Sequence, residues 1–307
     1  MKASVSLLMA AVLAASGAFV PSSSPSGPSF ASSPSFTIRK RVEEAHLSFS
    51  VKDRHGNAVN GLTPANLLVV QDGEPVTEIT SFYRYDDLPL RLVIMIDTSD
   101  SMREAFSHER RMAESMLYRM QRSTADEVSI VSFSATSQIT NTGEQENTLA
   151  AMQGLRAAGQ TALYDTLYES IRGLMDRAEV TPVRRAIVVF SDGEDNWSRH
   201  NLLDVIAVAQ QADLPIYAIS VHSRRVEFQG DAILRQLADA TGGRAFFPGN
   251  YGGFEKIYAA IGTDLQAHYV IGFRPAERSK QPGYHTTNVR IRDRKLDVRS
   301  RTGYYVP

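Results

Sequence analysis

Residues 92–101 read Leu-Val-Ile-Met-Ile-Asp-Thr-Ser-Asp-Ser, and this stretch decides the fold. Its apolar part, 92–96, predicts a strand that is buried on both faces, because every position needs apolar cover. Such strands belong to parallel sheets that have helices on both sides. The polar part places Asp97, Ser99 and Ser101 on the loop after the strand, at the edge where open parallel sheets bind ligands.

Composition is that of a soluble globular protein with one large domain and a smaller one. The chain has 307 residues, of which 43% are hydrophobic and 22% are charged, and its net charge is −1. No basic field is present that would indicate binding to nucleic acid. The sequence has no cysteine, so neither disulfide bonds nor a lipid-modified N-terminal cysteine is expected.

The N-terminal segment has the pattern of a secretory signal peptide over residues 1–18. A single Lys2 precedes a small apolar stretch from Ala3 to about Ala15, and small residues follow. The alternative is an uncleaved anchor, but the stretch is shorter than the roughly 20 residues that a span needs. Residues 19–36, rich in Ser and Pro, predict a disordered linker. We expect a secreted or periplasmic protein with no membrane span after cleavage.

Strand and helix patterns alternate between residues 89 and 268. This order predicts a doubly wound, mostly parallel α/β sheet. The expected strands are 92–96, 128–133, 186–190, 216–221 and 244–247. The expected helices are 104–121, 162–177, 202–212, 232–240 and 254–265.

The flanking segments, 37–88 and 269–307, have β patterns. Strands are expected at 47–51, 67–70, 76–83 and 269–273, with a hairpin formed by 287–292 and 295–299, and Tyr304-Tyr305 lie near the end of the sequence. Neither segment has enough strands to be stable alone. We therefore expect both segments to pack together as one β-sandwich-like module.

Two further stretches carry polar residues at the same expected sheet edge as Asp97. Residues 159–165 open a helix and include Thr161, and residues 188–195 are a buried strand that ends at Asp192. Taken singly, the hydroxyl residues can be helix caps and Asp192-Gly193 can be a turn. Together they present two carboxylates and three hydroxyls, an oxygen-only set that suits Mg²⁺.

This set resembles the metal-ion-dependent adhesion site of von Willebrand factor type A (VWA) domains, which have a Rossmann-like fold. The family pattern, Asp-x-Ser-x-Ser followed by a Thr and an Asp, falls on Asp97, Ser99, Ser101, Thr161 and Asp192. The segment 237–243, Leu-Ala-Asp-Ala-Thr-Gly-Gly, is also typical of the family. The flanks resemble bacterial VWFA-related proteins that are common in Acidobacteria. The resemblance implies a site for Mg²⁺ or Mn²⁺ and a partner protein that completes the coordination through an acidic side chain.

Three residues beside the pattern are candidates for contact with that partner. Asp100 stands where the family often has Gly, and its charge either weakens binding of an acidic partner or faces solvent. Glu194 raises the same question, with a surface turn as the alternative. Trp197, the one tryptophan, is either a binding anchor or packs against the start of the next helix.

No pattern of a catalytic site is present in the sequence. The seven histidines lack metal-ligand spacing, and neither a Gly-x-Ser-x-Gly motif nor a phosphate-binding loop occurs. We expect a protein-binding module rather than an enzyme. The alternatives are an assembly component of the cell envelope with a structural metal and, as a weaker candidate, a metal-assisted hydrolase.

Overall fold

A computed structural model describes residues 44–84, 88–121, 123–140, 145–179, 183–220, 229–248, 253–292 and 295–306. The expected signal peptide and linker lie outside these residues. Within the described ranges, no helix combines the length and the apolar character that crossing a membrane requires.

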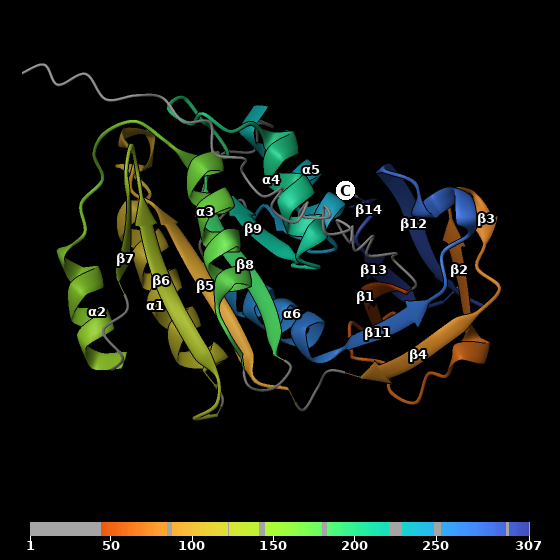
Figure 1. Ribbon diagram of the computed structural model, residues 1–307. Coiled ribbons are helices and arrows are strands. Elements are labelled where there is room, and N and C mark those ends of the chain that lie inside the picture. The colour runs from red at the N-terminus through yellow and green to blue at the C-terminus, as the bar shows by residue number, and fades with distance from the viewer. Residues whose placement is uncertain are drawn as a thin grey trace, which may run out of the picture. The chain divides into compact units, whose positions relative to one another are not determined.

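A six-stranded sheet forms the centre of the α/β part, in the order β10-β9-β8-β5-β6-β7 (Figure 1). Five strands are parallel, and the edge strand β7 runs antiparallel to β6. The strands are β5 (Leu90–Asp97), β6 (Glu127–Phe133), β7 (Ser137–Thr140), β8 (Arg184–Ser191), β9 (Ile216–Ser220) and β10 (Ala245–Phe246). The predicted doubly wound, mostly parallel sheet is therefore confirmed.

The apolar run in β5 is continuous because helices cover both faces of the sheet. Leu92, Ile94 and Ile96 belong to one buried cluster, together with residues of α1, α2 and α6. Val93 and Met95 belong to the other cluster, together with residues of α3, α4 and α5. The helices are α1 (Phe106–Met120), α2 (Gln145–Gly154), α3 (Leu163–Asp176), α4 (Leu202–Gln211), α5 (Gln229–Thr241) and α6 (Phe254–Gln266).

In the described α/β part, the strand β7 and the α-helix α2 have no counterpart among the predicted strands and helices. β7 has the sequence Ser-Gln-Ile-Thr, and its one large apolar residue, Ile139, is 73% exposed. An edge strand of this kind buries little, so it carries no apolar pattern. In α2 the polar residues outnumber the apolar ones, and Met152 is its one member of the buried cluster.

The flanking segments form two four-stranded antiparallel sheets, in the orders β13-β1-β11-β4 and β14-β12-β2-β3. Side chains from both sheets share one core, including Leu47 and Ile271 from the first sheet and Val69 and Val289 from the second. The strands are β1 (Ala45–Lys52), β2 (Leu67–Gln71), β3 (Glu74–Pro75), β4 (Ile79–Arg84), β11 (His268–Phe273), β12 (Gly283–Ile291), β13 (Asp297–Ser300) and β14 (Gly303–Val306). The expectation of one shared sandwich-like module is confirmed.

Two predicted details of this module are wrong. The strand expected at 76–83 begins only at Ile79, as β4, because the chain changes sheets before that point: β3 and the Val76 N–H bond to β2, whereas β4 pairs with β11 in the other sheet. The hairpin expected from 287–292 and 295–299 does not form. β12 pairs with β2 and β14, whereas β13 pairs with β1 in the other sheet.

Buried charges join the β-module to the α/β part. Lys52 of β1 forms an ion pair with Asp264 of α6, with 2.5 Å between Nζ and Oδ1. The Arg301 guanidinium donates to the carbonyl oxygens of Gln210 in α4 and His46 in β1. These bonds fix α4 and α6 against strands of the flanking module.

Candidate metal centre

The loop after β5 holds Asp97, which is fully buried at the carboxyl end of the strand. Its Oδ1 accepts the Ser99 backbone N–H at 3.0 Å. The hydroxyls of Ser99 and Ser101 lie 3.1 Å apart. Ser99 precedes the 3-10 helix Asp100–Met102 but makes no capping bond with its side chain. The capping explanation for Ser99 is therefore wrong.

The loop after β8 meets the first loop through Ser191. Its hydroxyl donates to Asp97 Oδ2 at 2.7 Å and accepts the Gly193 N–H at 3.0 Å. Asp192 is buried, and its Oδ1 accepts the Glu194 N–H at 3.0 Å. Its other oxygen, Oδ2, is buried without a hydrogen-bond partner among the described residues.

The Thr161 loop is bonded to both of the others. The Asp100 N–H donates to the Gly159 carbonyl at 2.9 Å, on the side of the first loop. On the other side, the N–H groups of Asn196 and Trp197 each donate to the Thr161 carbonyl at 3.0 Å. The three predicted loops thus meet at one edge of the sheet.

Residues of the third loop, not Thr161, cap helix α3. The Asp195 carboxylate accepts the Tyr164 N–H at 2.9 Å, and the Ser198 hydroxyl accepts the Asp165 N–H at 2.9 Å. Thr161 has no capping role, since Ala162 occupies the N-cap position and makes no side-chain bond. Asp195 therefore has a structural role as a cap of α3.

A close backbone contact fixes the turn that carries Asp192. Gly193 has a φ of +80°, and a Cβ placed on it would lie 2.3 Å from the Gly230 carbonyl oxygen at the start of α5. A left-handed conformation and this contact both require glycine here. The same contact holds the Asp192 turn against α5.

Glu109 is a buried acidic residue that the sequence pattern did not reveal. It lies in α1 and is fully buried; its Oε1 accepts the Asp97 backbone N–H at 3.1 Å. Its Oε2 is buried without a partner among the described residues. The signal in the sequence is weak: a glutamate on the helix face that also carries Phe106, Met112 and Ala113.

Burial and mutual repulsion disfavour the charged forms of these carboxylates. Burial raises the pKa of Asp97 to about 7; hydrogen bonds from Ser99 and Ser191 oppose this shift, and the Asp192 charge adds to it. Burial, followed by the Asp97 charge, raises the pKa of Glu109 well above its usual range. Both shifts therefore come from burial and from the closeness of these carboxylates to one another.

The residues present fit a divalent cation. Asp192 Oδ2 is a buried oxygen without a partner among the described residues, and the set as a whole supplies carboxylate and hydroxyl oxygens, which are hard ligands. The described residues contain no group of three or more His, Cys, Asp or Glu side chains arranged for a metal. A site with two carboxylates and three hydroxyls is not a group of that kind.

The three candidate contact residues lie on these loops. Asp100 is exposed and pairs with Arg103, with 2.5 Å between Oδ1 and Nη2. Glu194 is exposed beside Asp192. Trp197 is 57% exposed, and its backbone is bonded to Thr161, so its indole is not packed away under the next helix.

The family model of the von Willebrand factor type A domain matches residues 92–260, more than half of the 307-residue chain. The chain belongs to the VWA family. VWA domains are commonly metal-dependent protein-interaction modules, and many bind a divalent metal at the adhesion site described above. The resemblance of the flanks to the narrower bacterial family stays a prediction.

Solved structures with similar folds come from several sources. Proximal thread matrix protein 1 from the mussel byssus is 14% identical with a TM-score of 0.49, and the alignment covers 64% of this chain and 51% of that one. The same protein with a zinc-occupied MIDAS motif has 14% identity and a TM-score of 0.49, covering 62% and 48%. The PilB minor pilin from Streptococcus sanguinis has 14% identity and a TM-score of 0.45, covering 59% and 62%. The match spans about half the length of the mussel chains. No curated protein matches this sequence.

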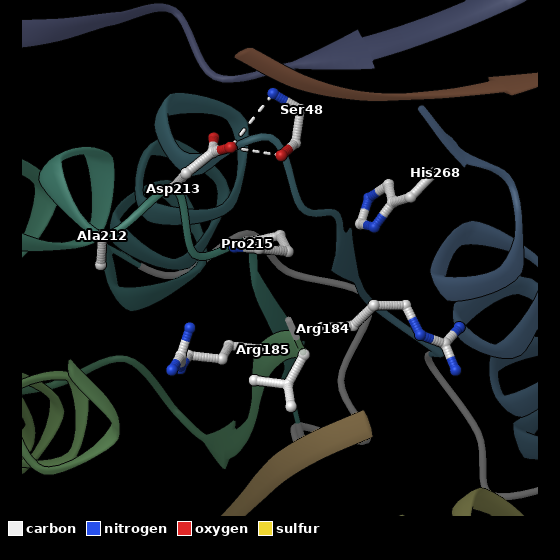
Figure 2. Close-up of a pocket in the computed structure, with 8 residues that line it drawn as sticks. Ser48, Arg184, Arg185, Ala212, Asp213, Pro215 and His268 are labelled. Atoms are coloured by element: carbon white, nitrogen blue, oxygen red, sulfur yellow. Dashed lines mark hydrogen bonds between the residues drawn. The ribbon is translucent and has the colours of Figure 1, made fainter. Parts of the chain in front are cut away.

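A separate small cavity lies near the other ends of the VWA strands. Its volume is about 90 Å³, and its lining includes Arg184 at the start of β8, Pro215 before β9 and His268 at the start of β11. Figure 2 shows His268 and Arg184 on one side and Asp213 on the other, where two hydrogen bonds join Asp213 to Ser48. This cavity shares no residue with the metal centre.

Proposed function

We propose that this VWA domain is an exported protein-binding module that holds Mg²⁺ or Mn²⁺ through Asp97, Ser99, Ser101, Thr161 and Asp192. Two observations carry the proposal: the three loops are hydrogen-bonded to one another, and Asp192 on one of them has a buried carboxylate oxygen, Oδ2, without a partner among the described residues. A divalent cation at this point would offset the mutual repulsion of the buried carboxylates.

The kinds of residue at the site indicate how a bound cation would interact with a partner protein. Neutral hydroxyl ligands hold a cation without cancelling its charge, so one coordination position is able to accept a carboxylate from another protein. The Asp97 carboxylate is held by bonds to Ser99 and Ser191, and its backbone N–H by Glu109, so this buried residue is fixed at the carboxyl end of β5. Membership of the VWA family supports metal binding by this set, since many members hold a divalent metal at the matching residues.

The partner is proposed to bind through an acidic side chain, with Trp197 as a neighbouring contact. The Trp197 backbone is bonded to the Thr161 loop and its ring is exposed, which makes it a candidate anchor beside the site. The Asp100 charge is offset by Arg103, which reduces its repulsion of an acidic partner. A catalytic role is not part of the proposal.

Metal-dependent capture of a protein partner tests this function. The full chain is immobilised and exposed to cell-envelope extract with Mg²⁺ or Mn²⁺, with EDTA, and as the Asp97→Ala variant. Asp176→Ala is the matched control, because Asp176 is exposed at the end of α3, away from the loops. The proposal expects capture by the wild type and the control, and its loss with EDTA and with Asp97→Ala.

The same samples distinguish the alternatives. Stabilisation by metal without metal-dependent capture of any protein would replace the adhesion role with a structural one. Hydrolysis of a model phosphoester that requires metal and Asp97 would replace it with an enzyme.

A further inference from the structure

A groove between α3 and α4 is separate from the metal centre. It has a volume of about 430 Å³, within the usual range of roughly 300–1,000 Å³ for small-molecule sites. Its lining residues are Tyr168, Arg172, His200, Asp204, Ala207, Val208, Gln211 and Tyr305. None of these belongs to the metal set.

Aromatic rings that line the groove are held in place by their neighbours. Tyr168 stacks on His200 with 4.0 Å between ring centroids and 14° between planes, and the Asp165 carboxylate lies 2.6 Å from Nδ1 of His200. Tyr305, which is 50% exposed, packs against Tyr284 with 5.0 Å between ring centroids. These rings need no further ordering when a ligand binds, so little affinity is lost to conformational entropy.

The polar side chains that line the groove differ in whether they have hydrogen-bond or ion-pair partners. The side chains of Arg172 and Gln211 make no ion pair or hydrogen bond with another residue in the described part of the chain. Asp204, in contrast, accepts the Asn201 N–H at 2.9 Å in the first turn of α4, where the helix dipole favours its charge. Among the described lining residues, Arg172 is thus the cation with no ion-pair partner, and the Asp204 carboxylate is engaged by the helix backbone.

We propose that this groove binds a saccharide that carries a carboxylate, such as a uronic acid unit. The flat, C–H-rich faces of a sugar ring match aromatic walls, and planar amide and imidazole groups suit its hydroxyls. The guanidinium matches the carboxylate, which it is able to bind in a bidentate manner. A polyanion such as nucleic acid does not fit, because the described lining residues offer a single free cation.

Titration calorimetry on the full chain tests the proposal with three probes: trigalacturonate, the neutral sugar cellotriose and the acidic peptide triglutamate. We expect trigalacturonate to bind more tightly than the other two. Tyr305→Ala weakens its binding by about tenfold or more, as loss of an aromatic anchor does. Arg172→Gln removes the preference for trigalacturonate over cellotriose.

Two controls keep this result independent of folding and of the metal centre. Tyr118→Ala removes another exposed tyrosine, 58% exposed on α1, and leaves binding unchanged. EDTA and Asp97→Ala also leave trigalacturonate binding unchanged. A failure of this inference is therefore distinguishable from a failure of the proposed metal-dependent function. The proposal is overturned if neither sugar binds at up to about 10 mM, if triglutamate binds best, or if Tyr305→Ala has no effect in a protein with unchanged melting temperature.

Discussion

At the scale of single residues, Gly193 is the point on which the position of Asp192 depends. Its φ of +80° and the clash that a Cβ would make with Gly230 both exclude a side chain. We expect Gly193→Ala to lower the free energy of unfolding by about 3 kcal/mol and to weaken metal binding. Equilibrium denaturation and metal titration measure the two effects.

Gly173 is the matched control for this substitution. It lies inside α3, and nothing stands within 4 Å of a Cβ placed on it. Gly173→Ala should raise the free energy of unfolding by about 0.5–1 kcal/mol, because alanine favours the helix. Equal effects of the two substitutions would contradict the account of the Asp192 turn.

Glu109, in α1, supports the site because its carboxylate accepts the Asp97 backbone N–H. Glu109→Ala removes this acceptor and leaves a cavity, so we expect a loss of about 2–4 kcal/mol in the free energy of unfolding. Glu109→Gln keeps an oxygen acceptor and removes an unpaired acidic group, so it should cost far less. A similar loss in both variants, measured by urea denaturation, would show that the bond to Asp97 is not what matters.

The site illustrates what a sequence pattern predicts at this scale. Asp97, Ser99 and Ser101 lie within five residues, so their proximity follows from the local chain alone. Glu109 could not be assigned, because a glutamate in a helix is ordinarily exposed, and its burial depends on how α1 packs on β5. The capping role of Asp195 depends in the same way on two loops meeting.

At the scale of elements, the start of β11 contains a pH-sensitive histidine. His268 is buried beside the small cavity, and burial is the first cause that lowers its pKa below 6.5, with Arg184 acting in the same direction. Asp264 and Asp213 act in the opposite direction. The folded protein therefore binds a proton at His268 less readily than the unfolded chain does.

Stability should fall as the pH is lowered through about 6.5, because the unfolded chain then takes up a proton that the folded protein does not. His268→Asn should reduce this loss between about pH 7 and pH 5. His55→Asn is the control, since His55 is exposed. Unchanged pH dependence in the His268 variant, followed by thermal unfolding, would contradict this assignment.

The elements differ in how far the sequence predicts them. β5 and β8 are long apolar runs, and their ends are predicted to within two residues, whereas β7 and α2 bury too little to leave a pattern. Local sequence patterns also do not predict which strand pairs with β13. Its pairing with β1 joins residues about 250 positions apart, and local spacing favours a hairpin with β12 instead.

At the scale of the whole molecule, the β-module and the VWA domain share buried charged groups. Arg301, from the chain between β13 and β14, donates to carbonyls of α4 and β1 and pairs with Asp213 at 3.4 Å. We expect Arg301→Leu to lower the free energy of unfolding by about 3–5 kcal/mol, because several buried acceptors lose their donor. Arg54→Leu, at an exposed turn, is the control.

The domain boundaries at 89 and 268 remain a prediction, and testing them also tests the contact between the β-module and the VWA domain. A fragment of residues 89–268 should fold less stably than the full chain, since it lacks Lys52, Arg301 and both flanking sheets. Circular dichroism melting of the fragment and the full chain compares them. Two flanks that fold separately when expressed alone would contradict the shared sandwich.

The most direct test of the central claim is calorimetric titration of the EDTA-treated full chain with Mn²⁺ and Mg²⁺. We predict one saturable site and a rise in melting temperature, equivalent to about 2.7 kcal/mol when the metal concentration is 100 times its Kd. Asp97→Ala and Asp192→Asn abolish both effects, whereas Asp176→Ala retains them. Absence of metal binding in the wild type, or undiminished binding in Asp192→Asn, would contradict the account.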